Sequence, residues 1–164
     1  MKNRGFTLVE VIVAISIVII ISAVVMINLN PFRLIKLDAA AKKVSVDLQY
    51  ARNLALSTAK WYGVSFEVDP VNTYSVFQSN GANTVIEDPA RPGESFVVNL
   101  YDYLGGVKIW SVDFGGAATV KFNPLGIPYR GNGTLLTATS VITLEYSGIT
   151  KTVQVTPNTG SIPQ

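Results

Sequence analysis

The sequence of 164 residues predicts an α+β fold, in which one long N-terminal helix, half of it transmembrane, packs on antiparallel β-sheets. Three observations predict this class. The chain begins with a long apolar run, continues with a segment whose apolar residues have helical spacing, and from about residue 64 changes to a period of two. The length suits a single main domain.

The composition excludes several kinds of site. The chain has no Cys and no His, which rules out Cys/His catalytic pairs, zinc sites built on those ligands, thiol redox chemistry and disulfides. The net charge of +2 excludes a wholly basic, polyanion-binding surface. Only 15% of residues are charged against 48% hydrophobic, whereas an ordinary soluble domain has about 25% charged residues. This imbalance indicates a membrane segment or an unusually apolar surface.

The apolar excess lies at the N-terminus. Phe6 to Ile27 form a run of 22 residues in which Glu10 is the one charged residue. As a helix, this run would extend about 33 Å, enough for a hydrocarbon core of about 30 Å. It is longer than the apolar core of a secretory signal, and no small-residue cleavage site follows it. We therefore predict a transmembrane half of the helix over residues 6–31, with the short N-terminus in the cytoplasm and residues 32–164 outside.

Glu10 has two interpretations from its position alone. A carboxylate inside an apolar span is costly and marks a functional site when a partner can be named. No basic residue lies within the run, so an internal partner is not available. The alternative is that the side chain reaches the headgroup region from near the end of the span.

Residues 2–10, Lys-Asn-Arg-Gly-Phe-Thr-Leu-Val-Glu, resemble the class III signal of type IV pilins and type II secretion pseudopilins. The shared pattern is a short basic leader ending in Gly, then Phe, a carboxylate four residues later, and a long apolar stretch. The resemblance implies that a prepilin peptidase removes residues 1–5 by cutting between Gly5 and Phe6 and then N-methylates Phe6. It also implies that Glu10 pairs with the Phe6 ammonium of a neighbouring subunit during assembly.

Residues 32–60 read as an amphipathic helix that continues the apolar helix, with Pro31 expected to kink it or loosen a turn. Asp47 is expected to fall off the apolar stripe, together with the other charged residues. The stripe at i+3/i+4 spacing comprises Leu37, Ala41, Val44, Leu48, Ala51 and Ala55. Two ion pairs at i,i+4 spacing are expected, Asp38–Lys42 and Lys43–Asp47.

The period of two begins with Val64, Phe66 and Val68, which alternate with polar residues. Residues 69–72 form a predicted turn into a second strand. Residues 79–95 are expected to be a loop, because they are rich in Asn-Gly, Asp-Pro and Pro-Gly pairs. Further strands are predicted over 96–100, 107–114, 119–123, 141–146 and 149–156, the last two joined by Ser147-Gly148.

The same region resembles the GspH/FimT family of minor pseudopilins and pilins, in residues 48–56, 64–66, 122–128 and 153–160. The resemblance implies two β-sheets beside the helix and a non-enzymatic minor pseudopilin, at or near the tip of a type II secretion pseudopilus, that assists protein export. The alternative is a minor type IV pilin (FimT-like) in pilus assembly, adhesion or DNA uptake. The implied partners are other pseudopilins in a hetero-oligomeric filament, the prepilin peptidase and inner-membrane lipid, with a periplasmic C-terminal domain.

Other classes of function find little support in the residues. Glu67 with Asp69, and Glu87 with Asp88, are candidate acid–base pairs, but a solvated surface explains them better. A calcium ion held by Glu87, Asp88 and Glu94 is conceivable, although the spacing fits no calcium loop. No catalytic residue, metal or cofactor is therefore predicted. A membrane-anchored binding domain of another class, or an anchored hydrolase, remains as a rival.

Nucleic acid is not an expected partner. The last 34 residues contain one basic residue, Lys151, whereas phosphate contact requires clustered Lys and Arg. The sequence does not decide whether Arg91 and Arg130 lie close together in space. Four aromatic residues are expected to pack in the core or between strands: Trp61, Tyr101, Tyr103 and Trp110.

Overall fold

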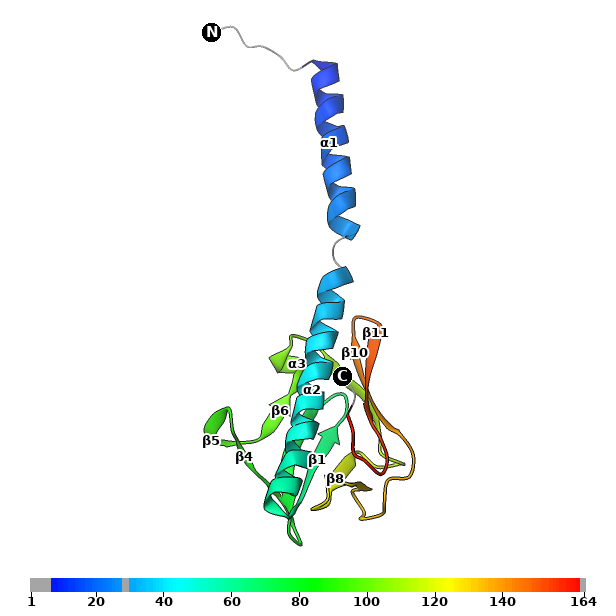
Figure 1. Ribbon diagram of the computed structural model, residues 1–164. Helices are drawn as coiled ribbons and strands as arrows, with labels where there is room; N and C mark the ends of the chain where they lie inside the picture. Colours follow the sequence, from blue (N-terminus) through cyan, green and yellow to red (C-terminus); the bar gives the residue numbers. More distant parts are fainter. Residues whose placement is uncertain (1–6, 28–29, 163–164) are drawn as a thin grey trace.

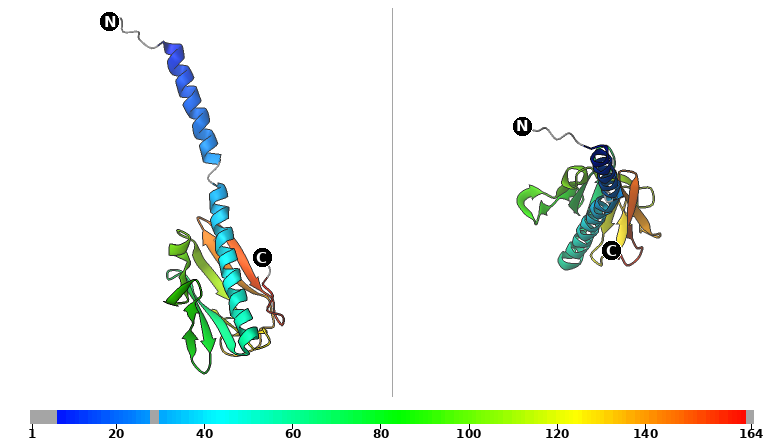
Figure 2. Two further views of the ribbon diagram at one scale, coloured as in Figure 1. Left: turned by 60° about the vertical axis from the view of Figure 1, so that its left-hand side comes forward. Right: turned by 90° about the horizontal axis from the view of Figure 1, so that it is seen from above.

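A computed structural model describes residues 7–27 and 30–162. Helix α1 (Leu8–Ile27) extends away from the sheets, whereas helix α2 (Asn30–Thr58) lies along them (Figures 1 and 2). The sequence predicts one long helix, and the structure describes two; residues 28–29, between them, lie outside the described residues. Pro31 occupies the first turn of α2, where proline is tolerated because that turn lacks intrahelical acceptors for its N–H groups.

The strands form two antiparallel sheets and one small hairpin. The large sheet has the order β3-β2-β1-β8-β9, and β6 also pairs with β2. The small sheet has the order β11-β10-β7, and β4 pairs with β5. The bounds in the large sheet are β1 (Trp61–Glu67), β2 (Thr73–Ser79), β3 (Asn83–Val85), β6 (Val97–Asn99), β8 (Thr119–Phe122) and β9 (Pro128–Arg130). The others are β4 (Glu87–Asp88), β5 (Arg91–Ser95), β7 (Lys108–Asp113), β10 (Ser140–Tyr146) and β11 (Ile149–Val155).

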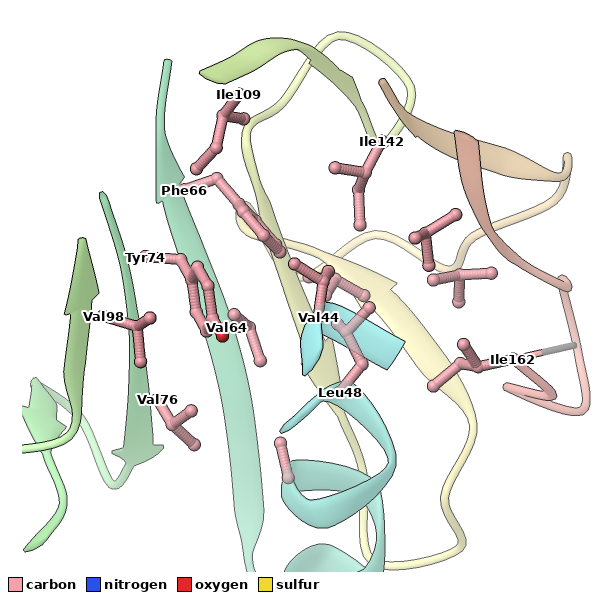
Figure 3. Packing of buried hydrophobic residues seen from close by; sticks show 14 of the residues in the cluster. Val44, Leu48, Val64, Phe66, Tyr74, Val76, Val98, Ile109, Ile142 and Ile162 are labelled. Atoms are coloured by element: carbon pink, nitrogen blue, oxygen red, sulfur yellow. The ribbon is translucent and has the colours of Figure 1, made fainter. Parts of the chain in front are cut away.

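Helix α2 packs against strands of both sheets, as the stripe of apolar residues predicts. Figure 3 shows Val44 and Leu48 of α2 among the buried side chains of the strands. The predicted stripe contains three alanines, whose small side chains let the helix backbone approach the sheets closely. All the predicted stripe residues are buried, and Ala40 joins them: Leu37, Ala40, Ala41, Val44, Leu48, Ala51 and Ala55.

The first hairpin confirms the predicted alternation at Val64 and Phe66, whereas Val68 lies beyond β1 and is exposed. Val64 and Phe66 of β1 are buried and stand opposite Val76 and Tyr74 of β2. The Phe66 ring also lies 6.0 Å from the ring of Phe114, which follows β7 of the small sheet. Apolar packing therefore runs from one sheet to the other beneath α2.

The predicted turn at residues 69–72 also joins the two sheets. Asn72 is buried, and its side-chain oxygen accepts a hydrogen bond of 2.9 Å from the backbone N–H of Ile109 in β7. Its side-chain nitrogen donates to Asp69 at 3.0 Å. Asn tolerates the left-handed conformation seen here (φ 56°), so one residue both closes the turn and fixes the small sheet.

Three expectations are wrong in detail. Residues 79–95 are not simply a loop, because they contain β3, β4 and β5. These strands are short and largely exposed, so they carry no apolar alternation that a sequence could show. The strand predicted over 96–100 ends at Asn99, whose side chain caps helix α3 (Leu100–Tyr103) by accepting from the Asp102 N–H at 3.2 Å. Strand β9, which begins at a proline, is not predicted.

We predict that the chain without residues 1–32 folds as a soluble α+β domain. Leu34 and Ile35 are 50% and 61% exposed, whereas Leu37, at 1%, is the first residue of α2 that the sheets cover. Circular dichroism should show a cooperative unfolding transition. A shorter chain that starts at Lys42 serves as the control, because it lacks Leu37, Ala40 and Ala41, and it should be clearly less stable. A non-cooperative transition for the longer chain would mean that the domain boundary is wrong.

Candidate assembly site

Glu10 lies in the first turn of α1, where it forms a reciprocal cap with Thr7. The Thr7 N–H and hydroxyl both donate to a carboxylate oxygen of Glu10, at 3.3 and 3.4 Å, and the Glu10 N–H donates to the Thr7 hydroxyl at 3.3 Å. This is the capping box of a Thr-x-x-Glu sequence, and a carboxylate is favoured at a helix N-terminus. The sequence carries this signature at residues 7–10, so the start of α1 at this point is predictable from the sequence.

The other two predicted site residues, Gly5 and Phe6, lie outside the described residues. The expected cut between them, the methylation of Phe6 and the pairing of Glu10 with another subunit therefore stay predictions. The structure adds the local surroundings of Glu10. Its carboxylate is held by Thr7, the second residue after the expected cleavage point.

The described side chains of α1 are exposed. Every large apolar side chain from Leu8 to Ile21 is at least 46% exposed. The hydroxyls of Ser16 and Ser22 donate to backbone oxygens one turn earlier, at 2.8 and 2.7 Å, so neither needs an outside partner. Within 7–27 and 30–162, no helix combines the length and the apolar character that crossing a membrane requires.

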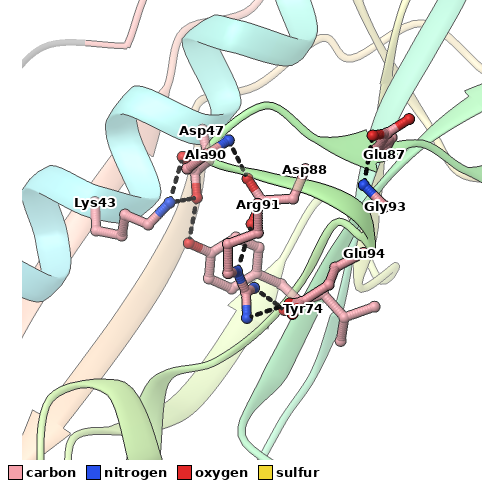
Figure 4. Close-up of polar contacts among 10 residues, drawn as sticks. Lys43, Asp47, Tyr74, Glu87, Asp88, Ala90, Arg91, Gly93 and Glu94 are labelled. Atoms are coloured by element: carbon pink, nitrogen blue, oxygen red, sulfur yellow. Dashed lines mark hydrogen bonds and ion pairs between the residues drawn. The ribbon is translucent and has the colours of Figure 1, made fainter.

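Asp47 is buried, so the prediction that it falls off the apolar stripe is wrong. Lys43 donates to both of its carboxylate oxygens, at 2.9 and 2.7 Å, as the predicted i,i+4 pair requires. The Tyr74 hydroxyl of β2 also donates to it, at 2.5 Å (Figure 4). Burial, and then the Asp47 charge, raise the pKa of Tyr74, so its hydroxyl stays a donor at neutral pH. The three residues link α2 to the large sheet.

A second polar cluster holds the β4–β5 hairpin (Figure 4). Asp88 accepts hydrogen bonds from the Ala90 N–H at 2.9 Å and from Arg91 at 3.0 Å, and Arg91 also contacts Glu94 at 2.9 Å. Burial by itself raises the pKa of Asp88, but the Ala90 and Arg91 hydrogen bonds outweigh it, so the pKa is lowered. Arg91 thus neutralises two of the three carboxylates considered for calcium. The third, Glu87, accepts from the Gly93 N–H at 2.6 Å.

The described residues contain no group of three or more Asp and Glu side chains placed to hold a metal ion. A cavity of about 520 Å³ does lie beside the hairpin, between α2, β6 and α3. Lys43 and Arg91, which line it, are paired with Asp47 and Asp88. The two basic residues that line the cavity are therefore already paired.

The remaining candidates do not come together as sites. Glu67 accepts from the Thr73 hydroxyl, whereas Asp69 accepts from Asn72, which lowers the pKa of Asp69, and from Lys108. These two carboxylates have separate partners and do not form an acid–base pair.

The two arginines considered for DNA contact also lie in different surroundings. Arg91 belongs to the β4–β5 hairpin and contacts two carboxylates. Arg130 ends β9, and its guanidinium packs so closely on Gly115 that a Cβ there would lie 2.5 Å from it. The structure gives these arginines no common surface.

The aromatic residues divide into two groups. Trp61 of β1 packs edge-on against Tyr129 of β9, with ring centroids 4.9 Å apart, across the intervening strand β8. Trp110, Tyr101 and Tyr103 are 60%, 47% and 63% exposed, so the expectation that they pack in the core is wrong.

The segments that carry the GspH/FimT resemblance meet at the C-terminal end of α2. Arg52 donates to the backbone oxygen of Gly126 at 3.2 Å, and Gln49 donates to that of Ile162 at 3.1 Å. Gly160 lies so close that a Cβ would be 2.5 Å from the Gly126 oxygen. Since these contacts fasten the β8–β9 turn and the C-terminal segment to α2, the shared residues have a structural role.

Comparisons with known proteins agree with this description. Residues 1–26 match the prokaryotic N-terminal methylation motif. The fold is similar to that of the minor pseudopilin EpsH from the type 2 secretion system of Vibrio cholerae, at a TM-score of 0.58 and 12% identity, covering 78% of this chain and 94% of that one. Two crystal structures of the Pseudomonas aeruginosa type IV minor pilin FimU have a TM-score of 0.49, with 15% and 14% identity, covering 78% of this chain and 92% and 98% of theirs. A search of curated proteins found no match.

The chain carries the N-terminal methylation motif, and the fold of its described domain is similar to that of a minor pseudopilin. The α+β class with an N-terminal helix on antiparallel sheets is confirmed, and so is the resemblance drawn from the leader and the helix.

We predict that Asp47→Ala lowers the free energy of unfolding by about 2 kcal/mol, because it leaves the buried Tyr74 hydroxyl and the Lys43 ammonium without their acceptor. Asp38→Ala is the matched control on the same helix. Asp38 pairs with Lys151 at the surface, and exposed pairs contribute about 0–1 kcal/mol. Urea unfolding of the two variants should separate them, and equal losses would show that the Asp47 network does not hold α2 on the large sheet.

Proposed function

We propose that this protein is a non-enzymatic minor pseudopilin subunit of a type II secretion pseudopilus, at or near its tip, that assists protein export. The observation that carries the proposal is the N-terminal methylation motif joined to a fold shared with a minor pseudopilin. A minor type IV pilin is the second candidate, because the same motif suits both. The scarcity of basic residues after Gly131 argues against DNA uptake as its role.

In this proposal a prepilin peptidase cuts between Gly5 and Phe6, and residues 6–31 anchor the subunit in the inner membrane with residues 32–164 in the periplasm. The 22-residue run from Phe6 to Ile27, with Glu10 as its single charge, supports the anchor. The exposure of every described large apolar side chain of α1 also supports it, since the domain offers them no cover. In the assembled filament the same helix surfaces would pack on other pseudopilins.

Glu10 is the proposed assembly residue. A buried ion pair offsets the desolvation of its two charges only when its geometry is good. The bonds from Thr7 orient the Glu10 carboxylate at the start of α1, and Thr7 directly follows Phe6, where cleavage would create the ammonium. A neighbouring subunit can then present its own ammonium to an acceptor that is already held in place. A tip subunit has neighbours on one side only, so it needs only one half of this pairing.

Processing is tested by the intact mass of the protein from a host with a prepilin peptidase. We expect a chain that begins at an N-methylated Phe6. Gly5→Leu should block the cut, because a side chain at this position would crowd the site that accepts glycine. A wild-type chain that still begins at Met1 would contradict the proposal.

Assembly is tested by Glu10→Val at equal membrane levels. We expect normal insertion, because the change removes a polar group from the apolar run, but a partial loss of secretion and of co-purification with other pseudopilins. Ser16→Val is the matched control, since it also removes a polar group from α1, and the Ser16 hydroxyl is already satisfied within the helix. Wild-type secretion and yields for Glu10→Val would show that Glu10 has no pairing role here. If the wild-type protein restores pilus formation, rather than secretion, in cells that lack it, the type IV pilin alternative is favoured.

A further inference from the structure

Two Asn-Gly pairs, Asn80-Gly81 and Asn132-Gly133, lie in turns of the domain. At such a pair the backbone nitrogen of Gly can attack the side-chain amide carbon of Asn, because Gly has no Cβ to hinder the approach. A bond forms between that nitrogen, which loses its proton, and the amide carbon, and the side-chain nitrogen leaves as ammonia. Water then opens the cyclic imide on either side and gives Asp or isoaspartate. The reaction needs a free Gly N–H and an Asn side chain that can rotate.

At Asn132-Gly133 both reacting groups are held. The Gly133 N–H donates to the Arg130 backbone oxygen at 2.9 Å. The side-chain oxygen of Asn132 accepts from the N–H and the hydroxyl of Thr134, at 3.1 and 2.8 Å. Since attack on the amide carbon requires the side chain to swing towards Gly133, these three hydrogen bonds must break first.

At Asn80-Gly81 neither reacting group is held. Asn80 is exposed, and across residues 7–27 and 30–162 neither its side chain nor the Gly81 N–H has a hydrogen-bond partner. The turn is closed instead by the Asn80 N–H, which donates to the Ala82 oxygen at 3.2 Å. A Cβ added at Gly81 would meet no atom within 4 Å, so the space around the reacting atoms is open.

We propose that Asn80 is a site of spontaneous deamidation, with water as the only co-reactant, and that the fold protects Asn132. The product places a new negative charge in the turn between β2 and β3. Isoaspartate also adds a methylene group to the backbone beside the first pair of the β2–β3 ladder, Ser79 with Asn83. Because β3 has only three paired residues, modification at Asn80 should loosen this edge of the large sheet.

The experiment ages the folded full-length protein in detergent at mildly alkaline pH and follows both peptides by mass spectrometry after digestion. We expect the Asn80 peptide to gain the amide-to-acid mass difference and the Asn132 peptide to stay unchanged. The same chain unfolded in denaturant is the control, in which both peptides should convert at similar rates. Equal conversion in the folded protein, faster conversion at Asn132, or no conversion at Asn80 while the unfolded chain reacts would each overturn the proposal.

Two further measurements test the protection of Asn132 and the loosening of β3. Thr134→Val removes the hydroxyl that holds Asn132 and should raise conversion at Asn132 without changing the rate at Asn80. Hydrogen exchange of the aged protein should become faster in β3 but not in β10 or β11. An aged protein whose β3 exchanges as before would disprove the loosening of this edge.

Discussion

The folded domain depends on the packing of α2 against the strands. The apolar stripe from Leu37 to Ala55 is buried against both sheets, and these sheets share only limited contacts with each other, such as Phe66 with Phe114 and Asn72 with Ile109. Small side chains in the stripe bring the helix close, and Asp47 fixes its position through Tyr74. Without this helix, the inner face of the large sheet would be open to water.

The parts of the fold that can be predicted from the sequence are those whose apolar residues recur at a regular spacing. Helix α2 and strand β1 are each buried on one side, and one-sided burial produces a regular spacing of apolar residues in the sequence. The β4–β5 hairpin depends on Asp88 and Arg91 instead, and polar contacts between neighbours leave no such pattern. Asp47 was misjudged for a related reason. Helical spacing predicts the pair with Lys43, but it cannot show that a tyrosine from a strand also donates to the carboxylate and buries it.

The candidate site was predictable because its features are contiguous in the chain. Gly5, Phe6 and Glu10 stand out through their spacing, and the motif found at residues 1–26 agrees with it. The role of Thr7 was missed, although Thr-x-x-Glu is a known helix start. The partner of Glu10 belongs to another chain in the proposal, so neither one sequence nor one folded chain contains it.

The fastening of the C-terminal segment to α2 gives the domain a mechanical property. Gln49 and Arg52 hold Ile162 and Gly126 at the end of the helix that lies farthest from α1. A pull applied through α1 therefore reaches β strands from both sheets and the tail of the chain together. The β8–β9 turn and the tail are thus tied to one helix, so a shift of this helix end would displace both of them.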